Sequence, residues 1–227
     1  MESRLEWISD EEGILTVSEG QKEKLRFLVY IITDGEAELK LDRAEITELE
    51  DGISEAFLRM WNEGFEYPVL VESYGTEIDK ILRSTSVVEL EYSEYMMRCQ
   101  WRRNPESEHS LSGLVLLQEA DTTLYKNREG SFSCRLIPYP EENKLSYYLY
   151  EVEVDESKRN RGIASGCLTE LFQRLTQEED AVIYLQVGSY NAPAVHLYKK
   201  LGFVVHEELC YYTAKEGSMS WREKNQH

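Results

Sequence analysis

Hydrophobic residues follow two spacings along this chain, and each spacing predicts a different kind of element. Short apolar or alternating runs predict strands, and apolar residues three or four positions apart predict helices. In the first half, strands are predicted over residues 5–8, 14–17, 25–33, 37–41, 69–71 and 87–97, and helices over residues 53–61 and 78–82. The first half is therefore predicted to mix strands and helices.

The second half predicts the same order of elements. Its strands are expected over residues 114–117, 122–125, 131–137, 147–154, 181–187 and 204–213, and its helices over residues 163–175 and 193–201. Single letters match as well, since Ser73-Tyr74 align with Ser189-Tyr190. Because repeated units share one pattern, we predict an internal structural repeat.

A polar segment separates the two halves. Residues 98–110 contain Asn104-Pro105 and lack an apolar pattern, which is typical of a linker. We therefore expect a first domain over residues 1–97, a linker over 98–110, a second domain over 111–215 and a polar tail over 216–227.

The composition excludes several classes of partner. The 227 residues are 41% hydrophobic, which is enough to bury a core, and the formal net charge is −18. Such acidity disfavours nucleic acid and anionic membranes as partners, because both attract basic surfaces. The four cysteines are widely spaced, without a CxxC pair or a clustered histidine, so no metal site is expected. No apolar run suits a secretory leader or a membrane span, so we expect a cytoplasmic protein.

The segment RNRGIASG, Arg159 to Gly166, carries the clearest chemistry. It follows one predicted strand and opens the helix predicted over residues 163–175. Gly162 and Gly166 let the backbone approach a ligand closely, and the free N–H groups of a first helical turn attract an anion. Arg159 and Arg161 add two positive charges. The segment therefore predicts a phosphate-binding loop.

Two ligands suit such a loop: a dinucleotide, and the pyrophosphate of coenzyme A. Dinucleotide loops carry G-x-G-x-x-G, and an acidic residue follows at the end of the next strand. Here the spacing is Gly162-x-Ala164-x-Gly166, and the next strand ends at Gly188 without an acidic residue. This absence weakens the dinucleotide interpretation.

Two motifs together resemble a known family. The pattern R-x-x-G-x-A, Arg159 to Ala164, resembles motif A of the GCN5-related N-acetyltransferases (GNAT family). The run NAPAVHLYKKLGF, Asn191 to Phe203, resembles that family's motif B. The resemblance covers residues 147–213 and implies an α/β (α+β) protein with the GNAT fold, a mixed central sheet with helices on both faces. Together with the repeat, it implies tandem GNAT-like halves.

The resemblance also implies how individual residues would meet acetyl-CoA as co-substrate. Backbone groups of Val152 and Val154 would pair with the pantetheine amides, and Asn191 would contact the cofactor arm. Tyr198 would bind the coenzyme and protonate the departing thiolate. The N–H groups that would hold the pyrophosphate belong to Arg159, Asn160, Arg161, Gly162, Ile163, Ala164 and Ser165.

An attacking amine must first lose a proton, so the site needs a base. Glu151 and Glu153 are expected to share the strand face that carries Leu149. In similar enzymes a carboxylate on this strand acts as the base, often through water. Either glutamate is a candidate, and Glu151 is slightly preferred because it lies further from the strand end. His196, on the other side of its helix from Tyr198, is interpreted as a surface histidine.

The first half departs from the family's pattern. In place of the phosphate-binding loop it has DRAEITELEDG, Asp42 to Gly52, whose acidic residues would repel a pyrophosphate. The two helices that the family usually places after its first strand are evident in neither half. We therefore expect a degenerate first half that has no cofactor site, covers the sheet of the second half and contributes a wall to the acceptor pocket.

The preferred interpretation is a transferase that moves an acetyl group from acetyl-CoA to a primary amine. The amine, on a small molecule or a peptide, would attack directly in a ternary complex. The alternative is a non-catalytic acyl-CoA-binding module with a regulatory or structural role. Monomer and homodimer both remain open.

Overall fold

Four strands and a helix open each half of the chain, as the sequence predicts. The computed structural model describes residues 1–33, 35–102, 113–119, 122–141, 144–176 and 179–215. The chain divides into two units: unit 1 comprises Met1–Ser93 and Glu208–His227, and unit 2 comprises Glu94–Glu207.

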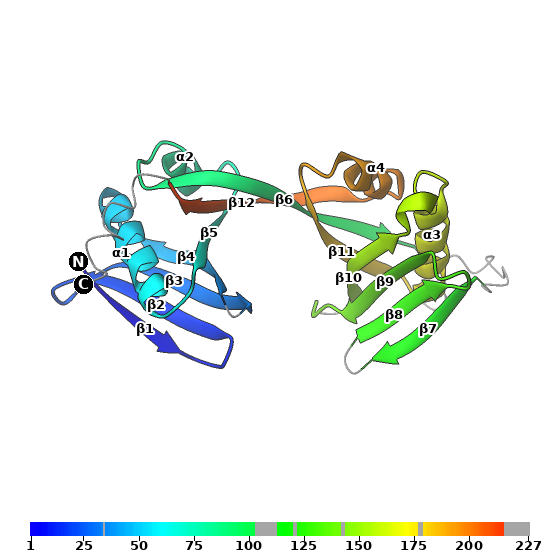
Figure 1. The fold of residues 1–227 in the computed structure, drawn as a ribbon, viewed down its shortest axis with the longest axis horizontal. Coiled ribbons are helices and arrows are strands. Elements are labelled where there is room, and N and C mark those ends of the chain that lie inside the picture. Colours follow the sequence, from blue (N-terminus) through cyan, green and yellow to red (C-terminus); the bar gives the residue numbers. More distant parts are fainter. Residues whose placement is uncertain (34, 103–112, 120–121, 142–143, 177–178, 216–227) are drawn as a thin grey trace. The chain divides into compact units, whose positions relative to one another are not determined.

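The elements of the first half run in the predicted order (Figure 1). They are β1 (Glu2–Trp7), β2 (Glu12–Glu19), β3 (Lys22–Thr33), β4 (Glu36–Ala44), the 3₁₀ turn η1 (Ile46–Glu48), α1 (Leu49–Asn62), β5 (Tyr67–Ser73), α2 (Glu77–Leu82) and β6 (Val88–Trp101). In unit 1 the strand order is β1-β2-β3-β4-β5-β12, and only the β4–β5 pair is parallel.

The second half repeats this order, which confirms the predicted internal repeat. Its elements are β7 (Leu114–Glu119), β8 (Thr122–Asn127), β9 (Phe132–Pro138), β10 (Leu145–Val154), the 3₁₀ turn η2 (Glu156–Lys158), α3 (Ile163–Leu175), β11 (Ala181–Gly188), α4 (Ala192–Lys200) and β12 (Val204–Ala214). In unit 2 the strand order is β6-β11-β10-β9-β8-β7, and only the β10–β11 pair is parallel.

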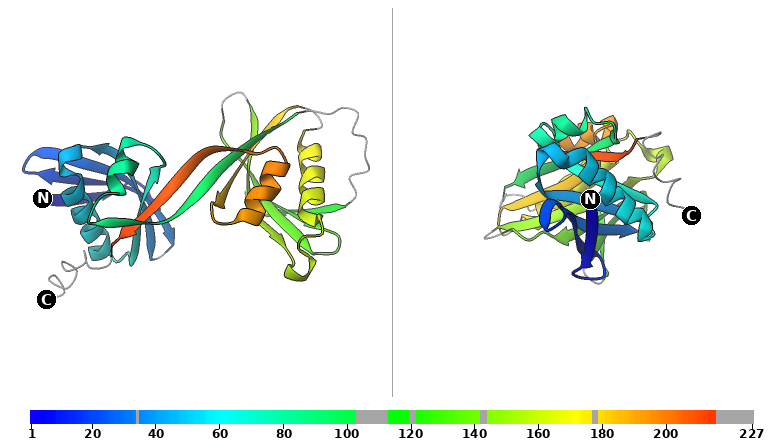
Figure 2. Two further views of the ribbon diagram at one scale, coloured as in Figure 1. Left: turned by 90° about the horizontal axis from the view of Figure 1, so that it is seen from above. Right: turned by 90° about the vertical axis from the view of Figure 1, so that its left-hand side faces the viewer.

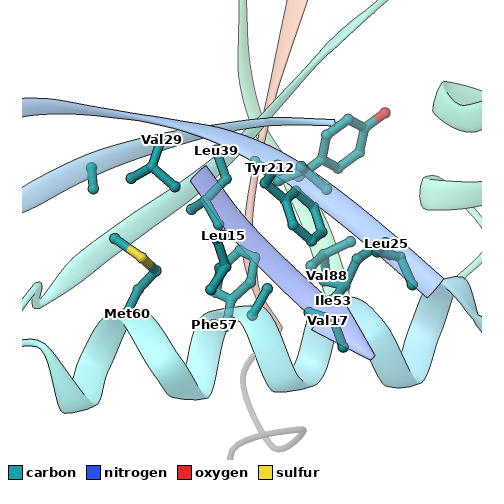
Figure 3. Close-up of a cluster of buried hydrophobic side chains, with 14 of the residues drawn as sticks. Leu15, Val17, Leu25, Val29, Leu39, Ile53, Phe57, Met60, Val88 and Tyr212 are labelled. Carbon is teal, nitrogen blue, oxygen red and sulfur yellow. The ribbon is translucent and has the colours of Figure 1, made fainter. Parts of the chain in front are cut away.

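The core of unit 1 lies between its sheet and α1 (Figure 3). Ile53, Phe57 and Met60 recur at helical spacing and are almost fully buried. They pack against strand residues such as Leu15 and Leu39, so one apolar stripe of α1 covers one face of the sheet.

The core of unit 2 is built in the same way. Phe203 lies next to both helices, since its ring is 5.9 Å from that of Phe172 on α3 and 5.7 Å from that of Tyr198 on α4. Figure 2 shows these two helices side by side. Each unit is thus the mixed sheet with helices that the sequence predicted, and the described helices of each unit contribute to one core.

Two strands cross the predicted boundaries. β6 begins in unit 1 and ends in unit 2, where Arg98 to Trp101 pair with β11 instead of starting a linker. β12 begins in unit 2 and ends in unit 1, where Leu209 to Tyr212 pair with β5. Residues 103–110 of the predicted linker and the predicted tail over 216–227 lie outside the described residues.

Candidate active site

Strands β10 and β11 separate at the end of their parallel ladder. Their register runs from Leu145 opposite Ala181 to Leu149 opposite Leu185, and both strands continue beyond the last pair. On the other side of β10, the register with β9 shifts between Tyr150 and Glu153. The resulting gap leaves the end of β10 without a β11 partner.

A β-bulge at Glu151 decides which face each residue of β10 occupies. Glu151 has a positive φ of 48°, and the bulge shifts the alternation of side chains by one position. Val152 and Val154 therefore join the same core cluster as Leu149. Glu153 lies on the opposite face, and the predicted face shared with Leu149 was wrong.

The loop between η2 and α3 turns the chain through two left-handed residues. Asn160 has φ 62° and Gly162 has φ 77°, a conformation that Asn and Gly adopt most readily. Gly162 is the N-cap of α3, and no side chain caps this helix. The first backbone hydrogen bond of the helix runs from Gly166 N–H to the Gly162 carbonyl. The earlier N–H groups of α3 thus remain available to an anion.

A cavity of about 1010 Å³ joins this loop to α4 and to the end of β10. Eleven of the predicted site residues line it: Val152, Glu153, Val154, Arg159, Asn160, Gly162, Ile163, Ala164, Ser165, Asn191 and Tyr198. The structure thus brings nearly all of the predicted site residues to one place.

Two predicted site residues lie away from this cavity. Arg161 is exposed, and its Nη2 donates to the Ser157 carbonyl at 3.1 Å. Glu151 forms an ion pair with Arg135 of β9, with Oε2 2.6 Å from Nε. Neither residue is among those that line the cavity.

Tyr198 and Asn191 both lie on α4 or at its start. Tyr198 is only 7% exposed and packs edge-on against Phe203. Burial raises the pKa of the Tyr198 phenol to about 12, so the hydroxyl keeps its proton at neutral pH. Asn191 caps α4 by accepting a hydrogen bond from the Ala194 N–H at 3.3 Å.

The structure adds residues that the sequence analysis did not place in the site. His196 is exposed, as expected of a surface histidine, but it also lines the cavity together with Lys200. Lys158 and the start of β9 around Phe132 contribute further lining. The four-residue spacing of His196 and Lys200, which places them on one face of a helix, was the signal available in the sequence.

Unit 1 lacks the loop at the corresponding position. In unit 2 four residues, 159–162, separate η2 from α3, whereas in unit 1 η1 ends at Glu48 and α1 begins at Leu49. The two positions correspond because Asp155 N–H donates to the Ser131 carbonyl, and Glu45 N–H donates to the Lys24 carbonyl.

A lysine occupies this part of unit 1. Lys24 is 8% exposed, and its Nζ lies 3.1 Å from Glu45, 3.5 Å from Glu48 and 3.5 Å from Glu19. Hydrogen bonding to Glu45 raises the pKa of Lys24. Glu45 and Glu48, two of the acidic residues that were expected to repel a pyrophosphate, are thus paired with a cation of the chain itself.

Comparison with known proteins agrees with this geometry. The model of the acetyltransferase (GNAT) family matches residues 89–203, half of the chain. The chain belongs to this family.

Individual relatives are similar over different lengths. A mycothiol acetyltransferase from Corynebacterium aurimucosum is 34% identical over 68 residues, which are 30% of this chain and 22% of that protein. The match thus spans about a fifth of the curated relative.

Solved structures share the fold. A GCN5-related N-acetyltransferase from Kribbella flavida is similar with a TM-score of 0.60, at 9% identity over 96% of this chain and 92% of its own. A tandem GNAT protein from the clavulanic acid biosynthesis pathway, solved without AcCoA, has a TM-score of 0.54, at 9% identity over 91% of this chain and 83% of its own. At these identities the likeness shows the tandem GNAT fold alone.

The described residues contain no group of three or more histidine, cysteine or acidic side chains that could hold a metal ion. None of the helices in the described part is long and apolar enough to span a membrane.

Proposed function

We propose that unit 2 transfers an acetyl group from acetyl-CoA to a primary amine by direct attack in a ternary complex. The observation that carries this proposal is the cavity that joins the uncapped start of α3 to Tyr198. Family membership and the similarity to an enzyme named as a mycothiol acetyltransferase support acetyl transfer. A cytoplasmic location and an amine on a small molecule or peptide remain part of the proposal.

The residues around the cavity suit coenzyme A. The free N–H groups at the start of α3 would hold its pyrophosphate, assisted by the charge of Arg159. Val152 and Val154 lie where β10 has no β11 partner, so this stretch of the strand is suited to the pantetheine amides. When bound, acetyl-CoA would supply the acetyl thioester.

The chain's own groups would then move two protons. A carboxylate takes a proton from the amine as its nitrogen forms a bond to the acetyl carbon. Tyr198, whose raised pKa keeps the phenol protonated beforehand, donates its proton to the sulfur as the carbon–sulfur bond breaks. Backbone N–H donors would stabilise the charge that develops on the carbonyl oxygen.

Glu153 is the better placed of the two candidate bases. It lines the cavity, whereas the carboxylate of Glu151 is paired with Arg135 and lies outside the lining. We therefore propose Glu153 as the base, which reverses the slight preference for Glu151 that its position along the strand suggested.

Replacing Tyr198 with Phe tests this function against a non-catalytic acyl-CoA-binding module. We expect Tyr198→Phe to lower turnover by about 10²-fold, a loss typical of a missing general acid, and to leave coenzyme affinity within about twofold. Turnover is followed as acetyl-CoA-dependent thiol release with a panel of primary amines, and affinity by calorimetry.

The control is Tyr190→Phe, which alters an exposed tyrosine that does not line the cavity. It should leave both quantities unchanged. Coenzyme binding without thiol release from any amine would favour the non-catalytic module. No binding by the wild type would exclude both functions.

A further inference from the structure

Two residues that line the cavity have no role in the proposed reaction. They are His196 and Lys200 on α4, which lie one helical turn apart and together form what we call the α4 wall. Side chains at this spacing project from the same face of a helix, so both can reach one ligand group. Their neighbour Lys199 is also exposed but does not line the cavity.

The side-chain donors of His196 and Lys200 are available to a ligand. Lys158, which also lines the cavity, is paired with Glu129 at 3.5 Å, and Arg159 donates from Nε to the Val154 carbonyl at 3.1 Å. By contrast, neither His196 nor Lys200 has an ion pair or side-chain hydrogen bond among the described residues.

The other charged groups of the cavity are acidic. Glu153, Asp155 and Glu156 all belong to β10 or to the segment directly after it. The acidic groups of the cavity therefore all belong to β10 and the segment after it, whereas α4 contributes the donors His196 and Lys200. This distribution favours an anionic ligand group on the α4 side.

Coenzyme A carries such a group in addition to its pyrophosphate. A phosphate monoester at the 3′ position of its ribose holds close to two negative charges at neutral pH, and dephospho-CoA lacks only this group. The start of α3 accounts for the pyrophosphate, and the end of β10 with Tyr198 accounts for the pantetheine arm. The α4 wall is left for the nucleotide end.

We propose that His196 and Lys200 form a subsite for the 3′-phosphate of the coenzyme and make unit 2 selective for acyl donors that carry it. Lysine binds phosphate as a compact charge with several donors, and histidine adds a directed N–H. The inference rests on the proposed function, because it assigns part of the same coenzyme site.

Calorimetry with coenzyme A and with dephospho-CoA tests the subsite. We expect the wild type to bind coenzyme A about tenfold more tightly than dephospho-CoA. Lys200→Ala should reduce this ratio about fivefold, as expected for the loss of hydrogen bonds to a charged group. The double variant His196→Ala/Lys200→Ala should bind both ligands about equally. Its affinity for dephospho-CoA should match that of the wild type.

Lys199→Ala is the matched control. It removes the same charge from the adjacent residue of the same helix, so it should keep the wild-type preference. Because His196, Lys199 and Lys200 are all exposed, the variants should fold, which circular dichroism checks.

Two results would overturn the subsite alone. One is equal wild-type affinity for the two coenzymes, and the other is an equally large effect of Lys199→Ala, which would indicate a diffuse electrostatic effect. If the wild type binds neither coenzyme, the proposed function fails and the subsite fails with it. Measuring the affinity of the wild type for both coenzymes therefore distinguishes failure of the subsite from failure of the proposed function.

Discussion

Single backbone conformations decide the chemistry of the loop before α3. Gly162 sits at φ 77°, and a Cβ at this position would meet no other atom within 4 Å. Its requirement for glycine is therefore conformational and not steric. Gly166 lies inside the helix, where a Cβ also meets open space, and it does not line the cavity.

The two glycines should respond differently to alanine. Gly162→Ala should cost roughly 1–2 kcal/mol of stability, because alanine is strained in the left-handed region, and it should weaken coenzyme binding. Gly166→Ala should raise stability by about 0.5–1 kcal/mol and leave coenzyme affinity unchanged. Urea unfolding and calorimetry measure both effects.

Each glycine variant serves as the control for the other. An equal loss of coenzyme affinity in both variants would contradict this geometry. It would show that the backbone at Gly166 also lies against the ligand, as the sequence motif suggested.

The loop and the turn before each first helix distinguish the two units at the level of elements. Unit 2 has a four-residue loop with free N–H donors, and unit 1 has a direct passage from η1 into α1. In unit 1, Lys22 and Lys24 neutralise Glu45, since Lys22 Nζ lies 2.5 Å from one of its oxygens and Lys24 Nζ 3.1 Å from the other. Unit 1 is therefore proposed to have no coenzyme site. It lacks this loop, and the lysines near the corresponding position already pair with acidic residues of the chain.

This ion cluster should make unit 1 sensitive to acid. Hydrogen bonds from Lys22 and then Lys24 lower the pKa of Glu45 in the folded state. A lowered pKa contributes stability that is fully present above the unfolded value, about 4.3, and is lost as the pH falls through the folded value. At pH values below about 4.3, we expect the urea midpoint of the wild type to decrease more steeply with falling pH than that of Glu45→Gln.

The control for this pH series is Glu36→Gln. Glu36 is exposed at the start of β4 and has no ion pair among the described residues, so its removal should leave the acid slope unchanged. Parallel slopes for the wild type and Glu45→Gln between pH 6 and pH 3 would show that the cluster does not contribute.

Crossing strands are the main feature of the whole chain. The last part of β12 belongs to unit 1, where Cys210, Tyr211 and Tyr212 are buried. Tyr212 donates to the buried carboxylate of Asp79, which also accepts from the Gly75 N–H at 2.9 Å and from Arg83. Burial alone would raise the pKa of Asp79, but these hydrogen bonds together lower it.

Removing the C-terminal part of the chain should therefore damage the unit that contains the N-terminus. Truncation after Glu207 removes the partner of β5 and three buried side chains from unit 1. We expect amide hydrogen exchange to lose protection in β3 and α1, while α3 and β11 of unit 2 keep theirs.

A shorter truncation after Lys215 provides the control. It retains every described pairing of β12 and should leave protection in both units unchanged. Loss of protection in unit 2 after truncation at Glu207 would contradict the assignment of this segment to unit 1.

Much of this protein is determined by the sequence alone. The order of the elements, the repeat, the loop before α3 and the motif tyrosine all depend on local spacing, and local spacing reflects the helix and strand periods directly. These features could be predicted because each one involves residues that are close together in the chain. The family followed from the two motifs for the same reason.

Other features were decided only by the tertiary structure. The bulge at Glu151 moved Glu153 to the opposite face of β10, Lys24 paired with acidic residues from β2 and from the turn η1 with its N-cap, and β12 joined the sheet of unit 1. His196 and Lys200 became cavity residues only once α4 packed beside the loop before α3. Each of these outcomes depends on which distant segments pack together, and the local spacing of residues does not specify which distant segment will pack against them.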